Sequence, residues 1–372
     1  MTAEGIAKLT MPKWGLSMTE GTVLEWLVDE GAEIASGQEI AEVETDKLSG
    51  AVEAQAAGTL RKQVAQAGEK VPVGGLLGVV APAEVSDDDV DAFVADFVES
   101  FEPEEEADAG PQPETVEVDG RRIRYLRHGE GDPIVLLHGF GGDLDNWLFN
   151  RDALAEAGEV VAIDLPGHGG SSKEIRDAGL EELTGVLGGV LDALGLERVH
   201  LVGHSLGGAV AAAWAAEHPD RVASLTLIAG AGLGDAISDE YVNGFLDARS
   251  RKQLRPVLAL LFADPDRLSR QLVDDVLKFK RLDGVDAALR SLAGAVFPDG
   301  RQAIDVRAAL GSVEAPVLVV WGEQDRILDP AHCEGLPEGV RVERLADAGH
   351  SPQMEVAGEV NRLLTAHVQG AS

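Results

Sequence analysis

Three residue types that cooperate in nucleophilic catalysis follow one another along the second half of the chain. Gly203-His204-Ser205-Leu206-Gly207 has the G-x-S-x-G pattern, Asp325 follows an apolar run, and His350 lies in Ala-Gly-His-Ser-Pro near the C-terminus. A serine hydroxyl is a weak nucleophile until a general base takes its proton, and that base needs a third group to orient it. The three residues therefore predict acyl-transfer chemistry at Ser205, with His350 as base and Asp325 as its orienting carboxylate.

Each of these assignments has rivals within the sequence. Asp329 lies four residues beyond Asp325, and we prefer Asp325 because it directly follows Trp-Gly-Glu-Gln. His138 and His168 lie in glycine-rich loops and His204 lies beside the serine. We expect these three histidines to be structural, with His138 holding its own loop by hydrogen bonding.

A second reactive group is suggested by a lysine in a short polar break. Residues 41–50 read AEVETDKLSG, in which Lys47 ends the run Glu44-Thr45-Asp46-Lys47. The simplest interpretation is a solvated turn lysine. The position of Lys47 within the surrounding sequence favours a more specific one.

An internal repeat surrounds Lys47. At a constant offset of 37, residues 21–43 match residues 58–80 in their glycines and in their apolar positions. Glycines at fixed places between short alternating runs are typical of turns between strands. The repeat predicts a small all-β domain of two similar halves, with Lys47 in the junction turn between them.

The elements needed to position Ser205 are visible in the second half. Apolar runs that suit buried strands begin four segments, and helical patterns alternate with them. The segments are 133–142, 160–172, 199–219 and 316–330. This alternation predicts a mainly parallel sheet. The G-x-S-x-G pattern falls between a strand and an Ala-rich helix, where the glycines would leave room for a tight elbow.

Composition limits the possible partners. The formal net charge of the 372 residues is −34, which argues against nucleic acid and anionic membrane surfaces as partners. The single cysteine, Cys333, excludes an internal disulfide and fits a reducing cytoplasm. The N-terminus lacks an apolar signal core and no stretch reaches the length of a membrane span, so we expect a soluble, cytoplasmic protein.

An acidic segment separates the two halves. Twelve acidic residues and no Lys or Arg occur between Glu84 and Asp108, which predicts an extended linker over 83–114. Apolar residues at helical spacing indicate an amphipathic helix near 87–101. Two interpretations stay open for it: packing on its own chain, or docking of a partner subunit.

The first half resembles the lipoyl domains. Their lipoyl-lysine lies in an E-T-D-K hairpin, which here is Glu44 to Lys47, and MPKWGLSMTEGTV resembles the family's opening strand and turn. Biotin carriers share this flattened barrel but place their lysine between methionines, where this chain has Asp46 and Leu48. The resemblance implies a lipoyl domain at 4–82 that carries lipoate covalently on Lys47, attached by a lipoate ligase or lipoyl transferase.

The second half, 115–370, resembles the α/β-hydrolase family in the order of its motifs. The resemblance implies a helical cap at about 232–310 and an oxyanion hole made by the backbone N–H groups of Leu206 and Phe140. The cap is rich in Arg. Those cations are either ordinary solvated helix faces or a site for phosphates or for the acidic carrier domain.

The fusion as a whole resembles the dihydrolipoamide acetyltransferase components of bacterial acetoin dehydrogenase complexes. That likeness implies thiamine-diphosphate-dependent, acetoin-cleaving subunits and dihydrolipoamide dehydrogenase as partners, and coenzyme A as acceptor. The sequence departs from the usual acyltransferase domain of such complexes because it lacks the H-x-x-x-D-G motif. Neither a cage-like core nor the usual histidine chemistry can be carried over.

The serine motif supplies the working hypothesis instead. Ser205 would take the acetyl group from lipoyl-Lys47 and pass it to coenzyme A. Two alternatives stay open: attack by water, which makes the protein a thioesterase, or a swinging-arm scaffold whose hydrolase domain has no part in the transfer.

Overall fold

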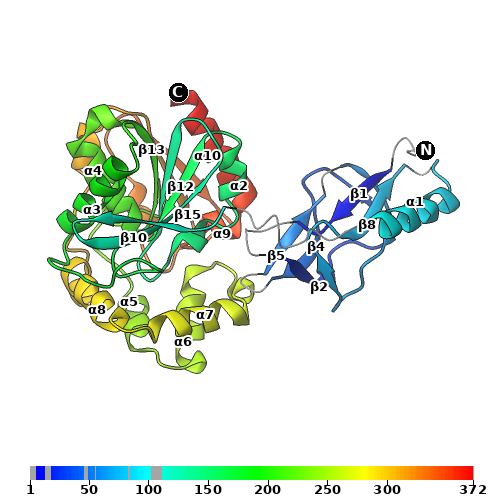
Figure 1. Ribbon diagram of the computed structural model, residues 1–372, viewed down its shortest axis with the longest axis horizontal. Coiled ribbons are helices and arrows are strands. Elements are labelled where there is room, and N and C mark those ends of the chain that lie inside the picture. Colours follow the sequence, from blue (N-terminus) through cyan, green and yellow to red (C-terminus); the bar gives the residue numbers. More distant parts are fainter. Residues whose placement is uncertain are drawn as a thin grey trace. The chain divides into compact units, whose positions relative to one another are not determined.

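The computed structural model divides into two compact units, which meet in the sequence between Gly110 and Pro111. It describes residues 6–12, 18–45, 49–54, 56–82, 84–101 and 111–371 (Figure 1). Lys47, Asp46 and Leu48 lie outside the described residues.

The N-terminal unit is a flattened barrel of two four-stranded sheets. Their strand orders are β1-β8-β6-β3 and β5-β4-β2-β7. All pairings within both sheets are antiparallel. The strand bounds are β1 Ala7–Thr10, β2 Glu20–Trp26, β3 Glu33–Ile34, β4 Glu39–Glu44, β5 Ser49–Glu53, β6 Gly58–Gln63, β7 Lys70–Pro72 and β8 Leu76–Ala81.

The structure confirms the internal repeat down to single hydrogen bonds. The amide of Gly31 donates to Leu60 O at 2.7 Å, and the amide of Gly68 donates to Val23 O at the same distance. Gly68 lies 37 positions after Gly31, and Leu60 lies 37 positions after Val23. Each half of the repeat therefore donates the same hydrogen bond to the other half. Gly31 and Gly68 have φ of 87° and 86°, a left-handed conformation that favours glycine. The sheet orders show the same exchange, since β2, β3 and β4 occupy the places of β6, β7 and β8.

The barrel core is made by the repeat's apolar positions. Val23, Val43 and Leu60 are fully buried. They belong to one cluster that draws side chains from both sheets. Alternate residues of β4, such as Glu42 and Glu44, are not fully buried, which is the pattern of strands with one face on a core.

Helix α1, Asp87–Ser100, packs on this barrel. Its Val90 is buried against Leu76 and Val79 of β8, and Phe93 and Phe97 pack on the same cluster. The packing matches the first of the two interpretations of this helix. The helix covers most of the range expected for it, 87–101, and its apolar face makes it part of the N-terminal unit in spite of its acidic composition.

The C-terminal unit is built on an eight-stranded sheet with the order β16-β15-β14-β13-β11-β12-β10-β9. The six strands from β16 to β12 are parallel, and β10 and β9 are antiparallel to their neighbours. The bounds are β9 Glu114–Val118, β10 Arg121–His128, β11 Pro133–Leu137, β12 Glu159–Ile163, β13 Val199–His204, β14 Val222–Ile228, β15 Val317–Gly322 and β16 Val340–Leu345.

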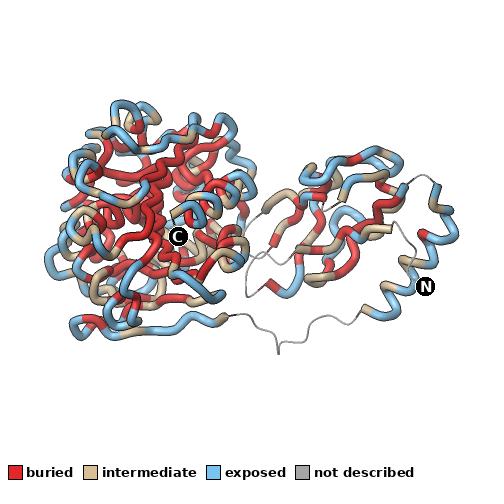
Figure 2. Tube along the Cα trace, turned by 90° about the horizontal axis from the view of Figure 1, so that it is seen from above, coloured by how far each residue is buried: buried red, intermediate tan, exposed pale blue. Residues whose placement is uncertain are grey.

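Helices cover both faces of this sheet. Figure 1 shows α3 and α4 on one face and α2 and α10 on the other. Figure 2 shows the buried strands running through the middle of the unit, with exposed chain around them. The helix bounds are α2 Arg151–Ala155, α3 Leu180–Ala193, α4 Leu206–Glu217, α9 Pro352–Glu355 and α10 Ala357–Ala371.

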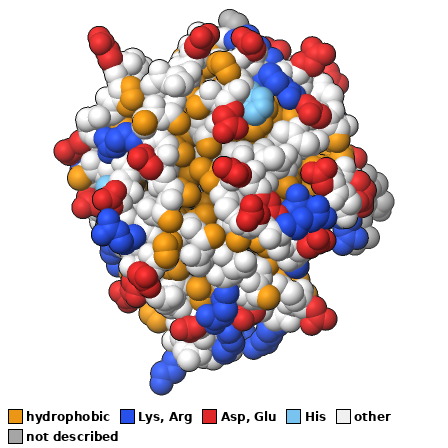
Figure 3. Space-filling model, turned by 90° about the vertical axis from the view of Figure 1, so that its left-hand side faces the viewer, with side chains coloured by type: hydrophobic (Ala, Val, Ile, Leu, Met, Phe, Trp, Pro, Cys, Tyr) orange, Lys and Arg blue, Asp and Glu red, His pale blue; other side chains and the backbone are white. Residues whose placement is uncertain are grey.

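Four further helices form a cap between β14 and β15 in the chain. They are α5 Asp239–Asp247, α6 Arg251–Leu258, α7 Arg270–Lys280 and α8 Val285–Val296. In Figure 3, Lys and Arg side chains gather at the lower end of the face with acidic ones between them. Pairs such as Arg249–Asp286 (2.6 Å) and Arg290–Asp247 (2.8 Å) favour ordinary solvated helix faces for many of the cap's cations.

Candidate functional site

Ser205 occupies the elbow between β13 and α4. Its φ of 52° and ψ of −117° are outside the regions that an L-residue normally adopts, so the backbone is strained at this point. A side chain at Gly203 would place its Cβ 2.3 Å from Gly207 O, and one at Gly207 would place it 2.3 Å from Leu137 O. The expectation that this elbow has no room for side chains at either glycine is confirmed.

His350 and Asp325 lie in contact. His350 Nδ1 is 2.8 Å from Asp325 Oδ2, and because a carboxylate can only accept, Nδ1 carries the proton. The other carboxylate oxygen of Asp325 accepts the N–H groups of Ile327 and Leu328 at 2.8 and 3.0 Å. The imidazole is thereby held in the tautomer that leaves Nε2 free to act as a base.

Asp329 has a different role in the structure. Its carboxylate accepts the N–H of Ala331 at 2.9 Å and caps a short 3-10 helix, Pro330–Cys333. The residue is exposed, whereas the Asp325 side chain is fully buried. Of the two rivals, the structure brings only Asp325 to His350.

His204 connects the elbow to the loop of His350. Its Nε2 donates to His350 O at 2.8 Å, and the two rings have centroids 4.9 Å apart. On the other side of the elbow, a Cβ at Gly139 would be 3.0 Å from Ser205 Cβ. Three loops, those of residues 138–142, 203–207 and 349–351, therefore meet at Ser205.

The two expected oxyanion donors adjoin this meeting point. Leu206 is the first residue of α4, where backbone N–H groups have no partner within the helix and the helix dipole is positive. Phe140 directly follows Gly139, and its carbonyl accepts the hydroxyl of Tyr241 from α5 at 3.3 Å. Burial raises the pKa of Tyr241, so its hydroxyl stays a donor. The cap thus contacts the peptide that follows Phe140.

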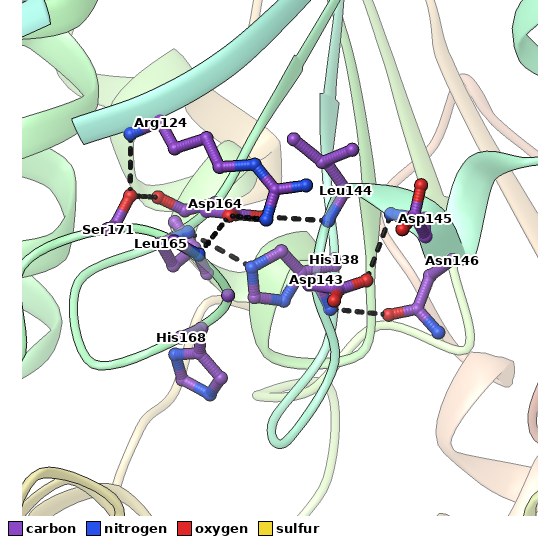
Figure 4. Close-up of polar contacts among 12 residues, drawn as sticks. Arg124, His138, Asp143, Leu144, Asp145, Asn146, Asp164, Leu165, His168 and Ser171 are labelled. Carbon is purple, nitrogen blue, oxygen red and sulfur yellow. Dashed lines mark hydrogen bonds and ion pairs between the residues drawn. The ribbon is translucent and has the colours of Figure 1, made fainter. Parts of the chain in front are cut away.

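Two buried histidines hold the loop of Phe140 in place (Figure 4). His138 Nδ1 donates to Gly139 O at 2.8 Å, and Nε2 accepts the N–H of Leu165 at 3.0 Å. His168 Nδ1 donates to Pro166 O, and Nε2 accepts the N–H of Gly141, both at 3.0 Å. Burial lowers the pKa of His138 to about 4 and the pKa of His168 to about 3, so both rings are neutral near pH 7. The expectation that His138 holds its loop is confirmed.

A buried carboxylate organises the same region, as Figure 4 shows. Asp164 is fully buried and accepts the N–H groups of Leu144 at 2.8 Å and Gly170 at 2.7 Å, with Arg124 Nη1 3.2 Å away. Burial raises the pKa of the Asp164 carboxyl. Burial and the nearby charges of Asp164 and Asp145 raise the pKa of Asp143 to about 7, although that residue keeps part of its surface exposed.

The described neighbours of Lys47 form the two strands of a hairpin. Glu44 of β4 pairs with Ser49 of β5, and Val43 pairs with Gly50. Thr45 is buried, and a pocket of about 260 Å³ lined by Thr45, Glu44 and residues of β2 and β7 adjoins the strand ends. The segment that carries Lys47 therefore joins two paired strands, a place that fits covalent attachment of a carrier group. No cluster of metal-binding side chains is found within the described ranges.

Several residues that shape the site gave no signal in the sequence. Tyr241 and Glu355 contact its loops from the cap and from α9. Their partners are about a hundred residues away or are main-chain atoms, and neither kind of contact leaves a local pattern. For His168 a signal existed, since Asp-Leu-Pro-Gly-His-Gly is a glycine-rich loop directly after a buried strand.

The fold and the elbow define an α/β-hydrolase domain joined to a carrier barrel, and comparisons with known families agree. Residues 132–357 match the model for the alpha/beta hydrolase fold, and residues 7–80 match the biotin/lipoyl model, described as biotin-requiring enzyme. Within the part of the chain that the structure describes, no helix is long and apolar enough to cross a bilayer.

Relatives that match nearly the whole chain identify a more specific family than the two domain models do. The dihydrolipoyllysine-residue acetyltransferase component of the acetoin cleaving system from Cupriavidus necator is 51% identical, over 98% of both chains. Its counterpart from Pseudomonas putida is 50% identical, over 98% of this chain and 99% of that protein. The chain belongs to this family of acetyltransferase components.

A solved structure supports the fold of the second unit alone. A meta-cleavage product hydrolase superimposes with a TM-score of 0.64 at 23% identity, over 69% of this chain and 98% of its own. That coverage matches the hydrolase unit without the barrel.

Proposed function

We propose that this protein transfers an acetyl group from a lipoyl thioester on Lys47 to coenzyme A, through an acyl-enzyme at Ser205. One observation carries the proposal. A strained serine elbow lies beside a His350–Asp325 pair with a 2.8 Å contact, in a chain whose first unit is a carrier barrel. The family to which the chain belongs is named for acetyl transfer at a dihydrolipoyllysine residue, which supports the donor side of the proposal.

Lipoate on Lys47 would supply a dithiol that carries the acyl group as a thioester. Ser205 Oγ attacks the thioester carbonyl carbon while His350 Nε2 takes the hydroxyl proton. The N–H groups of Leu206 and Phe140 stabilise the negative charge on the carbonyl oxygen. As the C–S bond breaks, His350 would return its proton to the leaving thiol, and acetyl-Ser205 would remain.

The second half of the reaction runs in reverse with a new thiol. His350 takes the thiol proton of coenzyme A, and the sulfur attacks the acetyl carbonyl. The ester C–O bond breaks and Ser205 Oγ recovers the proton, which gives acetyl-coenzyme A. If water replaces the thiol, the same residues yield acetate, and the protein is a thioesterase.

The proposed partners follow from this cycle. Acetoin-cleaving, thiamine-diphosphate-dependent subunits load the carrier, and dihydrolipoamide dehydrogenase reoxidises the dithiol after transfer. A lipoate ligase or lipoyl transferase modifies Lys47. Coenzyme A is the acceptor.

The test starts from purified, lipoylated full-length chain that has been acetylated on its dithiol. Wild type should form acetyl-coenzyme A, whereas Ser205→Ala should lose roughly a million-fold in rate, as expected for a missing nucleophile. Acetate as the main product in the presence of coenzyme A would establish the thioesterase instead. Full turnover by Ser205→Ala would establish the scaffold.

A second measurement tests the carrier site independently. Intact-mass spectrometry should find a lipoyl adduct on wild type and on the matched control Lys70→Arg, and none on Lys47→Arg. Lys47→Arg should still hydrolyse a small ester, because its hydrolase unit is unchanged. An adduct that persists in Lys47→Arg would place the lipoyl group elsewhere.

A further inference from the structure

The loop that carries His350 is fastened to one segment of the cap. That segment, residues 259–263, follows α6 and begins with a short 3-10 helix, Ala259–Leu261. The N–H of Ser351, the neighbour of His350, donates to Leu261 O at 3.0 Å. The N–H of Ala263 donates to Glu355 Oε2 at 2.6 Å.

The loop of Asp325 is fastened to the same cap segment. Arg326, the neighbour of Asp325, donates from Nη2 to Ala259 O at 2.6 Å and to Phe262 O at 2.5 Å. The carbonyl groups of Ala259, Leu261 and Phe262 are thus bonded to residues that flank the acid or the base, and the N–H of Ala263 is bonded to Glu355.

Glu355 is the centre of this attachment. Its Oε1 accepts the N–H of Gly349 at 2.8 Å, and its Oε2 accepts Ala263, so a single carboxylate joins the peptide before His350 to the cap. The contact is close, because a Cβ at Gly349 would lie 2.6 Å from Ala263 N. Arg267 of the cap also donates to Glu355 O at 2.6 Å.

The Glu355 carboxylate is buried between the two segments that it joins. Glu355 is only 5% exposed, and burial raises its pKa in spite of the backbone N–H groups of Ala263, Gly349 and Ser351. Without this carboxylate, the N–H groups of Ala263 and Gly349 would lose the acceptor that they share.

We infer that Glu355 is a positioning residue, which with Arg326 makes the cap segment 259–263 and the His350–Asp325 pair move as one body. This role rests on the proposed function in that His350 must reach Ser205 and the incoming thiol. Any displacement of the cap segment would then displace the imidazole of His350 with it. Displacement of reacting groups by about 1 Å typically costs around 100-fold in rate.

The test uses Glu355→Gln in the full-length chain, with acetyl ester hydrolysis as the readout. Glutamine keeps the shape but one of its two terminal atoms is a donor, so it cannot accept both N–H groups. The kcat should fall about 100-fold with KM little changed, in protein that urea unfolding shows to be folded under the assay conditions. The matched control is Glu359→Gln on α10, whose half-exposed carboxylate lies 3.8 Å from Arg362, and it should behave as wild type.

Arg326→Ala supplies the second arm, because this side chain is exposed and its loss need not disturb folding. Like Glu355→Gln, it should lower kcat, because it removes the hydrogen bonds from Arg326 to Ala259 O and Phe262 O. Wild-type kcat in both variants, or an activity loss that only follows the folded fraction, would overturn the positioning role. Should Glu355→Gln fail to fold, the kcat of Arg326→Ala decides.

Ser205→Ala run in parallel separates the two proposals. Ester hydrolysis that survives in Ser205→Ala defeats the proposed function itself. An inactive Ser205→Ala beside fully active Glu355→Gln and Arg326→Ala defeats the positioning role alone.

Discussion

The two units of the chain place a reactive side chain in opposite ways. In the barrel, the residues of the candidate site are consecutive, Glu44 to Lys47, and the described strands on either side are adjacent in sequence. In the hydrolase unit, Ser205, Asp325 and His350 come from three loops spread over 146 positions, and all three are buried. A carrier group must reach other proteins, so a hairpin turn suffices. A nucleophile must be held in one geometry away from water, and this takes long-range contacts.

The difference extends to how the structure is held together. The barrel repeats one motif, so each stabilising bond has a counterpart, as Gly31–Leu60 has Gly68–Val23. The hydrolase site has no such redundancy. A single carboxylate, Asp325, fixes the tautomer of His350, and a single elbow presents the serine. Substitutions in the second unit should therefore affect function far more than those in the first.

Among substitutions that keep the serine, the largest effect is expected for Asp325→Asn. Its amide can occupy the same space but favours the wrong imidazole tautomer, and the kcat for ester hydrolysis should fall about 10,000-fold. Asp329→Asn is the matched control, because that side chain only caps a 3-10 helix. Lipoylation of Lys47, followed by intact mass, should be unchanged in both variants. An equal loss in the Asp329 variant would reverse the assignment of the two carboxylates.

Next in size is a pair of core truncations, one in each unit. Leu60 of the barrel and Leu318 of β15 are both fully buried, and Leu→Ala at such sites costs about 2–5 kcal/mol of unfolding free energy. Because the two units are separately compact, each substitution should lower only its own unfolding transition. Differential scanning calorimetry of the full chain measures both transitions at once. A common shift of both would show that the units unfold together.

The sequence predicts the barrel better than the hydrolase site because the barrel depends on local features. The repeat spacing of 37 residues and the positions of its glycines can be read from short stretches, and the strands of the barrel follow them closely. In the second unit, Asp325 and Asp329 both follow a buried strand within a few residues, and in the sequence only the preceding Trp-Gly-Glu-Gln favours Asp325. What separates them is the contact with His350, 25 positions away.

One other contact lies beyond local patterns. The partners of Glu355 include Ala263, 92 positions earlier, and buried polar contacts of this kind have no periodicity. For helix α1 the apolar spacing predicts the helix but not its partner, and Val90, Phe93 and Phe97 pack on the barrel. Charge describes the exposed face of a helix, while the buried face decides where it packs.

A smaller effect, of about 1.4 kcal/mol per pH unit and per proton, should appear in acid. In the unfolded chain a histidine has a pKa of about 6.5, but the pKa of His168 and of His204 is lowered by burial to about 3. The unfolded state therefore binds the extra protons, and the free energy of unfolding falls as the pH drops below about 6.5. Asp143, with its pKa raised to about 7, acts in the opposite sense below pH 7.

The measurement is urea unfolding of the full chain at a series of pH values. In the transition of the hydrolase unit, His168→Gln should lower by about one proton the dependence of the unfolding free energy on pH below pH 6.5. The pH dependence of the barrel transition should be the same in wild type and in the variant, since all nine histidines lie in the second unit. An unaltered slope in His168→Gln would mean that this ring is not buried neutral.

The smallest effect tests whether α1 belongs to the barrel. Ser86 caps the helix, its Oγ accepting the N–H of Asp89 at 3.2 Å, and loss of such a cap costs about 1 kcal/mol. If α1 is an integral part of the unit, Ser86→Ala should lower the barrel transition by that amount, measured by urea unfolding. Ser100→Ala, at the other end of the helix where Oγ bonds only to Asp96 O and Phe97 O, is the control and should change little. If Ser86→Ala leaves the unfolding free energy of the barrel unchanged, α1 detaches before the barrel unfolds. The helix would then behave as the start of the connection between the two units. The chain would have three parts that unfold separately: the barrel, helix α1 and the hydrolase unit.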